Sequence, residues 1–219
     1  MEAAARLMCA YHDTRLAPDP RRAPVWKALW HYYFRHRIRP SDSVLDLGSA
    51  YGDFINNVVA ERRIAIDLWP GFVAHLDEEV EAIVGSVTDL SAIADNSIDY
   101  AFASNLFEHL TQEQFADTLA NLRAKLAPDG SLTILQPNYH YAYREYFDDY
   151  THVSIYSHIS LCDFLAANGF ETVEVHRRFM PLTVKSRLPT WGWLVGLYLA
   201  LPVKPFGKQM LVRARPKRR

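Results

Sequence analysis

A glycine-rich turn in the first third of the chain, flanked by acids, has the residue types and spacing to hold a nucleotide-like ligand. Residues 43–53 read Ser-Val-Leu-Asp-Leu-Gly-Ser-Ala-Tyr-Gly-Asp, an apolar run closed by Asp46 and followed by Gly48 and Gly52. Glycines permit backbone angles with positive φ and let the backbone approach a ligand closely. Residues 63–67 form a second apolar run that ends in an acid. In doubly wound folds an acid about 20 residues beyond the first strand hydrogen-bonds a ribose.

The glycine spacing separates this turn from the common dinucleotide-binding turn. That turn reads Gly-x-Gly-x-x-Gly, whereas here Ala50 stands between Gly48 and Gly52. A helix is expected directly after the turn, because hydrophobic side chains recur at helical spacing at Phe54, Ile55, Val58 and Val59. Such a helix directs its amide groups and positive dipole end at the ligand.

Length, composition and charge describe an ordinary globular chain. It has 219 residues, of which 49% are hydrophobic and 22% charged, with a net charge of −1. That length suits one domain with a sizeable core, and the charge gives no general attraction to nucleic acid or anionic membrane. Two cysteines are too few for a disulfide framework or a zinc site. With no signal-peptide pattern, we expect a cytoplasmic protein.

The rest of the chain alternates between helix and strand patterns. We expect helices over residues 23–37 and 68–79, a helix capped by Thr111 and Gln114, and one ended by Asn168 and Gly169. Residues 128–130 predict a turn. Further strands are expected over residues 81–85, 98–104, 132–135, 170–175 and 209–214. This alternation predicts an α/β fold with a mainly parallel sheet.

Four segments resemble, in order, the motifs of class I S-adenosylmethionine-dependent methyltransferases of the small-molecule type. Residues 46–52 resemble their Asp-x-Gly-x-Gly-x-Gly turn, and residues 99–110 their fourth-strand motif ending in Glu-His-Leu. Residues 126–132 resemble the Leu-x-Pro-Gly-Gly-x-Leu turn, and residues 149–157 the Asp-x-Thr-His-Val-x-x-Phe-Ser segment. Residues 185–189 and 207–210 further resemble a bacterial subgroup associated with polysaccharide and secondary-metabolite pathways.

The resemblance implies a doubly wound, Rossmann-like fold with a mainly parallel seven-stranded sheet and an antiparallel last strand. We divide the chain into an N-terminal helical extension, 1–40, and a methyltransferase domain, 41–219, in which 180–207 form an insertion or lid. S-adenosylmethionine is then expected across the carboxyl ends of the first four strands and leaves as S-adenosylhomocysteine. Carried over by position, its binding residues are Asp46, Gly48, Ala50, Tyr51, Gly52, Asp67, Leu68, Ser86, Val87 and Asn105. At Ser86 the family frequently has Asp, and the side chain has the alternative role of capping the next turn.

The chemistry of this cofactor sets what the protein must supply. Its methyl group is already activated on a sulfonium, so positioning is the main task and no metal is needed. A base is required only where the acceptor is a hydroxyl. His152 and His109 are the candidates, with structural hydrogen bonding and helix-start packing as their alternative roles. Asp148 and Asp149 are adjacent, so in a strand they would point to opposite faces, and no metal site is predicted.

Substrate binding is expected above the sheet. The loop after the fifth strand is rich in aromatic side chains that suit a ring or sugar face, although a packed lid would share this composition. Lys185 and Arg187 suit a phosphate or carboxylate, or are simply solvated. The predicted substrate-binding residues are Tyr139, Tyr143, Arg144, Tyr146, Lys185 and Arg187.

Residues 191–201 are strongly apolar but fewer than the 20 or so that span a bilayer. We expect them to cover the active site or form a homodimer contact, with a membrane-surface contact as the alternative.

The sequence therefore predicts a methyltransferase that uses S-adenosylmethionine on a hydroxyl of a small molecule such as a sugar, glycolipid precursor or secondary metabolite. No nucleic-acid partner or transmembrane segment is expected. Two other interpretations stay open: an RNA or protein methyltransferase, suggested by the basic C-terminal tail, and a catalytically silent partner subunit that retains the fold.

Overall fold

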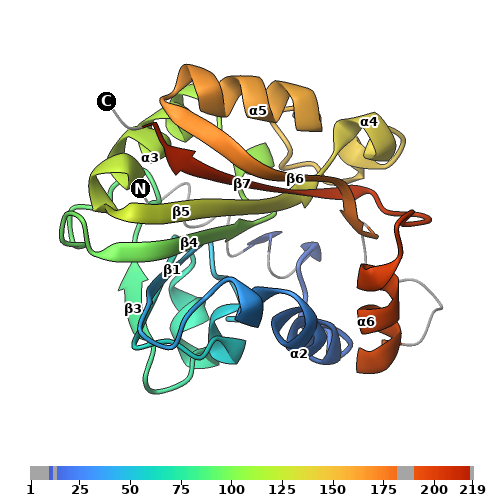
Figure 1. Ribbon diagram of the computed structural model, residues 1–219, viewed down its shortest axis with the longest axis horizontal. Helices are drawn as coiled ribbons and strands as arrows, with labels where there is room; N and C mark the ends of the chain where they lie inside the picture. Colours follow the sequence, from blue (N-terminus) through green and yellow to red (C-terminus); the bar gives the residue numbers. More distant parts are fainter. Residues whose placement is uncertain (1–9, 12–13, 182–189, 218–219) are drawn as a thin grey trace.

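A seven-stranded sheet in the order β3-β2-β1-β4-β5-β7-β6 runs through the middle of the molecule (Figure 1). The computed structural model describes residues 10–11, 14–181 and 190–217. The strands from β3 to β5 are parallel, and β7 runs antiparallel to both β5 and β6, which confirms the predicted sheet. The strands are β1 (Ser43–Leu47), β2 (Arg62–Asp67), β3 (Glu81–Val84), β4 (Ile98–Ser104), β5 (Leu126–Pro137), β6 (Phe170–Met180) and β7 (Gln209–Pro216).

Helices cover both faces of this sheet. The α-helices α3 and α5 lie on one face, and α2 and α6 lie side by side on the other (Figure 1). The α-helices are α2 (Arg22–Tyr32), α3 (Gln112–Lys125), α4 (Tyr139–Ala142), α5 (His158–Ala167) and α6 (Gly192–Ala200). Within the described residues there are also five short 3-10 helices: η1 (Phe34–His36), η2 (Ile55–Asn57), η3 (Pro70–His75), η4 (Phe107–His109) and η5 (Tyr146–Asp148).

Each face of the sheet has its own apolar core, because side chains alternate along a strand. On the α3/α5 face, Phe115 and Leu119 from α3 and Leu161 from α5 are fully buried against the sheet. On the α2/α6 face, Leu29 from α2 packs with Phe54 and Phe102, whose ring centroids lie 4.0 Å apart.

The capping box predicted for α3 is confirmed. Thr111 Oγ1 accepts a hydrogen bond from the Gln114 amide at 3.2 Å, and Gln114 Oε1 accepts one from the Thr111 amide at 2.9 Å. The cap fixes where α3 begins and therefore where the loop after β4 must end.

The helix predicted directly after the glycine-rich turn is wrong. The segment forms only the three-residue η2, and Val58 is already extended. The cause is Asn56, whose Nδ2 donates to the His75 carbonyl at 2.8 Å and whose Oδ1 accepts from the Asp77 amide at 3.1 Å. Asparagine side chains that bond to backbone in this way compete with helix formation. The turn is therefore not followed directly by a regular helix whose dipole would point at it.

Two further local predictions, a helix over residues 68–79 and a turn at residues 128–130, differ from the structure. Residues 68–79 form the six-residue 3-10 helix η3, with Pro70 at its start, rather than an α-helix. Residues 128–130 lie inside β5 instead of in a turn before it, at an irregularity where the register moves from Ile98–Leu126 to Tyr100–Ser131. The turn residues thus produce a bulge in a longer strand.

Glu174 on β6 ties the segment after α2 to the sheet. Its Oε1 accepts from Arg37 at 2.6 Å, from Tyr33 at 2.9 Å and from His176 Nε2 at 2.8 Å, and its Oε2 accepts from Arg37 Nε at 3.2 Å. The hydrogen bonds from His176, Arg37 and Tyr33 hold the pKa of Glu174 well below its usual range. A carboxylate with a lowered pKa stabilises the fold above its unfolded pKa, near 4, and this contribution is lost as the pH falls.

We expect Glu174→Gln to lower the free energy of unfolding by about 1–3 kcal/mol at pH 7, because the amide leaves Arg37 without its carboxylate. The difference from the wild type should shrink below about pH 4, where the wild-type carboxylate loses its advantage. Denaturant unfolding at pH 7 and at acidic pH measures both values. Glu171→Gln, an exposed change on the same strand, is the control. Equal effects of the two variants at pH 7 would contradict the assigned role.

Candidate active site

The turn between β1 and η2 is held in left-handed backbone conformations. Gly48 has φ +70°, Ala50 φ +48° and Gly52 φ +69°. The Ala50 amide donates to Asp67 Oδ2 at 2.8 Å, and the Trp69 amide donates to Asp67 Oδ1 at 2.8 Å. Asp67 at the end of β2 therefore fixes the shape of the turn that follows β1.

The turn is also crowded at its two glycines. A Cβ on Gly48 would lie 3.0 Å from Cδ1 of Leu106, and one on Gly52 would lie 2.8 Å from Nδ2 of Asn56. Ala50, in contrast, carries its Cβ in a conformation that costs an alanine about 1–2 kcal/mol. Two of the three left-handed positions therefore require glycine, and the third tolerates alanine with strain.

We expect Ala50→Gly to be neutral or to stabilise the protein by up to about 1 kcal/mol. The relief of left-handed strain is partly offset by the extra freedom of glycine in the unfolded chain, about 0.5–1 kcal/mol. Gly48→Ala should destabilise by about 1 kcal/mol or more, since it adds both strain and a contact with Leu106. Thermal and denaturant unfolding of the two variants tests this. A clear loss of stability in Ala50→Gly would show that the turn needs the alanine side chain.

Two carboxyl groups lie buried beneath the turn. Asp46 accepts a hydrogen bond from Ser49 Oγ at 2.8 Å, while burial, with a smaller contribution from nearby Asp67, raises the pKa of Asp46 to about 7. Burial also raises the pKa of Asp67, and the amides of Trp69 and Ala50 oppose that rise. Both acids remain able to accept hydrogen bonds from a ligand at this edge.

Most of the predicted cofactor-binding residues meet at the carboxyl edge of β1, β2 and β4. Asn105 follows β4 with φ +49°, and its Oδ1 accepts a hydrogen bond from Gln209 Nε2 at 2.8 Å. Leu106 then contacts Gly48, so the loop after β4 lies against the turn after β1. The residues at this edge are Asp46, Gly48, Ala50, Tyr51, Gly52, Asp67, Leu68 and Asn105.

Ser86 and Val87, after β3, take different positions. Ser86 Oγ lies 2.8 Å from Thr88 Oγ1 and accepts from the Thr88 amide at 3.3 Å, which is the turn-capping role that the sequence left open. Val87 is buried in the core of the α3/α5 face. Any contact of Val87 with a ligand would therefore come from its backbone.

Tyr51 belongs to a ring cluster beside the turn. Its ring centroid lies 5.3 Å from that of Trp69 and 4.8 Å from that of His75, and the Arg22 guanidinium carbon lies 4.8 Å from it. These flat surfaces adjoin Asp67 and suit a planar heterocycle.

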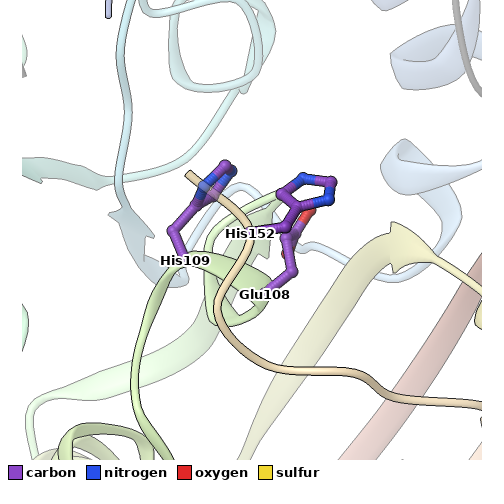
Figure 2. Close-up of side chains that lie close together, drawn as sticks. All are labelled: Glu108, His109 and His152. Carbon is purple, nitrogen blue, oxygen red and sulfur yellow. The ribbon is translucent and has the colours of Figure 1, made fainter. Parts of the chain in front are cut away.

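Glu108, His109 and His152 come together next to this edge and are called the Glu-His-His cluster below (Figure 2). Each offers one oxygen or nitrogen, and these atoms all lie within 4.8 Å of one another. Glu108 has 0% exposure, and neither of its carboxyl oxygens has a hydrogen-bond partner among the described residues. Burial raises the pKa of Glu108 to about 8.

Hydrogen bonds fix both imidazoles by their Nδ1 atoms. His152 Nδ1 lies 2.6 Å from the Tyr146 carbonyl, which can only accept. His109 Nδ1 lies 2.9 Å from Thr151 Oγ1, whose own proton goes to Asp149 Oδ1 at 2.6 Å. Each Nδ1 therefore donates, and each Nε2 keeps a free lone pair.

Burial also keeps these imidazoles neutral. It lowers the pKa of His109 to about 4 and holds the pKa of His152 below its ordinary value. The ring centroids lie 4.8 Å apart, so a proton on one ring disfavours a proton on the other. The site thus presents two neutral, oriented nitrogen bases near pH 7.

The N-terminal part of the chain reaches the same site. The Tyr11 hydroxyl donates to Asp149 Oδ2 at 3.0 Å, and Arg15 Nε lies 3.3 Å from that oxygen. The Tyr11 ring packs edge-on against His109, with centroids 5.6 Å apart. Residues far apart in the sequence therefore support the carboxylate that holds Thr151 and His109.

The predicted substrate-binding residues separate into three groups. Tyr146 is buried, donates its hydroxyl to the Ser154 carbonyl, and packs on His152 and Tyr139 with ring centroids 4.6 and 5.2 Å away. Tyr143 and Arg144 are exposed and bond to each other at 3.1 Å. Lys185 and Arg187 lie outside the described residues. The structure thus brings Tyr139 and Tyr146 to the histidines.

Sequence reasoning missed several supporting residues. Asp149 and Thr151 orient His109, and the Asp-x-Thr-His spacing of residues 149–152 was the available signal. Asp148 ends η5 and Asp149 follows it, so they are not adjacent strand residues as the metal argument assumed. Gln209 had no local signal, because its contact with Asn105 depends on how β7 pairs with β5.

The apolar stretch 191–201 forms α6 and its flanks. Val195 packs into the α2/α6 core, while Trp191 and Trp193 are each 60% exposed with ring centroids 5.9 Å apart. In the part of the chain that the structure describes, no helix has the length and apolar character needed to cross a bilayer.

The strand order, the single antiparallel strand and the glycine-rich turn at the carboxyl edge define the Rossmann-like methyltransferase fold. The sequence model of the family described as "Methyltransferase domain" matches residues 20–175, and the chain belongs to that family. A search of curated proteins found no significant match.

Solved structures with the same fold have low sequence identity to this chain. A SAM-dependent methyltransferase from Archaeoglobus fulgidus has a TM-score of 0.67 and 17% identity, covering 95% of this chain and 98% of its own. A second structure is Burkholderia thailandensis 1,6-didemethyltoxoflavin-N1-methyltransferase with bound 1,6-didemethyltoxoflavin and S-adenosylhomocysteine. Its TM-score is 0.63 and its sequence identity 19%, and the match covers 99% of this chain and 89% of the neighbour. A third structure is a chain from the complex of the Haloferax volcanii Trm112 methyltransferase activator with its proposed methyltransferase. Its TM-score is 0.65 and its sequence identity 15%, and the match covers 92% of this chain and 100% of the neighbour.

Proposed function

We propose that this protein transfers a methyl group from S-adenosylmethionine to a hydroxyl of a small molecule, such as a sugar, glycolipid precursor or secondary metabolite. The family match, and neighbours of the same fold that use S-adenosylmethionine or bind S-adenosylhomocysteine, support the cofactor. The observation that carries the hydroxyl assignment is the pair of neutral imidazoles oriented by their Nδ1 atoms beside the cofactor edge.

The buried acids and the turn fit the proposed cofactor. Asp67 would accept hydrogen bonds from the ribose hydroxyls on the lone pairs that the Ala50 and Trp69 amides leave free. Asp46 and Asn105 lie at the same edge and would bind the methionine part. Tyr51 and Leu68 offer apolar surface for the adenine. S-adenosylmethionine supplies a methyl group already activated on sulfur and leaves as S-adenosylhomocysteine.

The Glu-His-His cluster is where the acceptor hydroxyl would lie. Its proton must leave as the oxygen is methylated, and the free Nε2 atoms of His152 and His109 are the available acceptors. Tyr146 and Tyr139 form an aromatic wall beside His152 that suits the apolar side of a ring. His152 is the more accessible of the two histidines because His109 is covered by Tyr11.

We expect Asp67→Ala to weaken S-adenosylmethionine binding by about 1–3 kcal/mol, because ribose hydrogen bonds and the anchor of the turn are lost together. Isothermal titration with S-adenosylmethionine, and with NAD as the comparison ligand, measures this. Wild-type protein should bind the first and not the second. Glu171→Gln controls for the loss of a surface charge, and unfolding curves show whether Asp67→Ala keeps its fold. Unchanged affinity in a folded variant would refute the placement of Asp67.

We expect His152→Ala to reduce kcat by about 10²–10⁴-fold on a hydroxyl acceptor while leaving S-adenosylmethionine affinity unchanged. The measurement is S-adenosylhomocysteine formation with a panel of glycosides and phenols. His140→Ala, at an exposed histidine on the neighbouring helix α4, is the control and should keep full activity. Wild-type rates in His152→Ala would remove this residue from the reaction.

The competing proposal is a catalytically silent or partner-dependent methyltransferase. It is supported by the structural neighbour that comes from a complex with the Trm112 activator. It predicts that the isolated chain fails to bind S-adenosylmethionine. An RNA or protein methyltransferase remains the third alternative and predicts substrate binding that weakens as salt rises. Four points of the sequence analysis remain predictions. They are the domain boundary at residue 40, the lid over 180–207, a homodimer or membrane contact through 191–201, and a cytoplasmic location.

A further inference from the structure

We propose that the Glu-His-His cluster binds one divalent transition-metal ion, with Zn²⁺ as the expected occupant, through Glu108, His109 and His152. The sequence alone predicts no metal here, because S-adenosylmethionine needs none and the adjacent acids Asp148 and Asp149 would point to opposite faces of a strand. The metal-binding proposal stands on the geometry of the cluster. Only its catalytic consequence rests on the proposed function.

The spacing of the three side chains is close to that of a coordination site. One atom from each lies within 4.8 Å of the others. Ligands at zinc-site distances of about 2.0–2.1 Å in tetrahedral geometry lie about 3.4 Å apart. Closing this gap requires the side chains to move together: Glu108 and His109 follow each other in η4, and His152 lies beside them on a loop from another part of the chain (Figure 2).

The cluster brings together two imidazole lone pairs and one buried carboxyl group. His152 Nδ1–H donates a hydrogen bond to the Tyr146 carbonyl, and His109 Nδ1–H donates one to Thr151 Oγ1. Each Nε2 keeps its lone pair, and both oxygens of the fully buried Glu108 lack a hydrogen-bond partner among the described residues. Buried polar groups of native proteins are normally paired. A cation in the middle of the cluster would pair all three side chains at once.

Outer hydrogen bonds orient the ligands in the way that metal sites require. A metal-binding histidine almost always donates its other ring N–H to a carbonyl or a carboxylate. His152 uses the Tyr146 carbonyl directly, and His109 reaches the carboxylate of Asp149 through Thr151. Tyr11 and Arg15 in turn hold Asp149. The N-terminal segment therefore contributes to the rigidity of the site.

The ligand chemistry selects the kind of metal. Two imidazoles and one carboxylate suit Zn²⁺ and neighbouring first-row ions, whereas Mg²⁺ prefers an octahedral shell of oxygens. Three protein ligands leave a further coordination position open, as in catalytic sites. If the proposed function holds, the bound ion would take over the role of the free Nε2 atoms: it would lower the pKa of an acceptor hydroxyl bound at this position, and the hydroxyl proton would pass to solvent as the oxygen is methylated.

The competing explanation is a proton in place of the metal. A protonated Glu108 would donate one hydrogen bond to one Nε2 and leave the other nitrogen unpaired. This alternative predicts a cluster that does not bind metal and a protein whose stability is unchanged by Zn²⁺.

The test is titration of tag-free, chelator-treated full-length protein with Zn²⁺ and Co²⁺ alone. We expect one equivalent of Zn²⁺ to bind at micromolar or lower concentration, a rise in Tm, and visible absorption bands of histidine-bound Co²⁺. Glu108→Gln and His152→Ala should each weaken Zn²⁺ binding by at least about 100-fold, and Thr151→Val by about 10–100-fold through the lost orientation of His109. His140→Ala is the matched control and should bind normally.

Two results would overturn the proposal: no Zn²⁺ binding by folded wild type, or equal binding by wild type, Glu108→Gln and His152→Ala. Glu108→Gln keeps the shape of the side chain, so it remains informative where an alanine variant fails to fold. Titration of S-adenosylmethionine in the presence of chelator separates the two proposals. Cofactor binding without metal binding would refute the metal site alone, and metal binding without cofactor binding would refute the proposed function alone.

Discussion

The carboxylate of Asp67 is the constraint on which the cofactor edge depends. It receives the Ala50 amide from the turn after β1 and the Trp69 amide from the segment after β2. Because β1 and β2 are parallel and adjacent, a single side chain at the end of one can define the turn at the end of the other. The same parallel pairing places β4 beside β1, so that Leu106 closes over Gly48. The turn is therefore shaped by neighbours on both sides.

The absence of a regular helix after this turn changes how a ligand can be recognised there. A helix N-terminus would offer several parallel amides and a positive dipole. With the three-residue η2 in its place, recognition must come from the buried acids and from the flat rings around Tyr51. Acids suit the hydroxyls of a ribose better than they suit phosphates, because a carboxylate repels phosphate charge. The turn is consequently better matched to a nucleoside with a cationic sulfur than to a dinucleotide.

Local sequence signals predicted what depends on local structure. The strands over 43–47 and 62–67 are apolar runs ended by acids, and the Thr111–Gln114 cap is a contact over three residues, so both could be found without tertiary information. The segment over 54–59 failed because Asn56 bonds to residues about twenty positions away, which no periodicity records. Glu108 is fully buried without a hydrogen-bond partner among the described residues and lies close to His152, and both features depend on tertiary contacts that the sequence does not record.

The Glu-His-His cluster shows why single residues in such a site resist assignment from sequence. His109 has a structural role, because the Tyr11 ring packs against it and Thr151 Oγ1 hydrogen-bonds to its Nδ1. The Thr151 hydrogen bond also leaves its Nε2 with a free lone pair. For His152, the Tyr146 carbonyl likewise fixes the ring and at the same time decides which nitrogen can act. A structural contact and a free basic nitrogen are therefore not alternatives for these histidines. The hydrogen bonds that hold each ring in the fold are the ones that leave its Nε2 lone pair free.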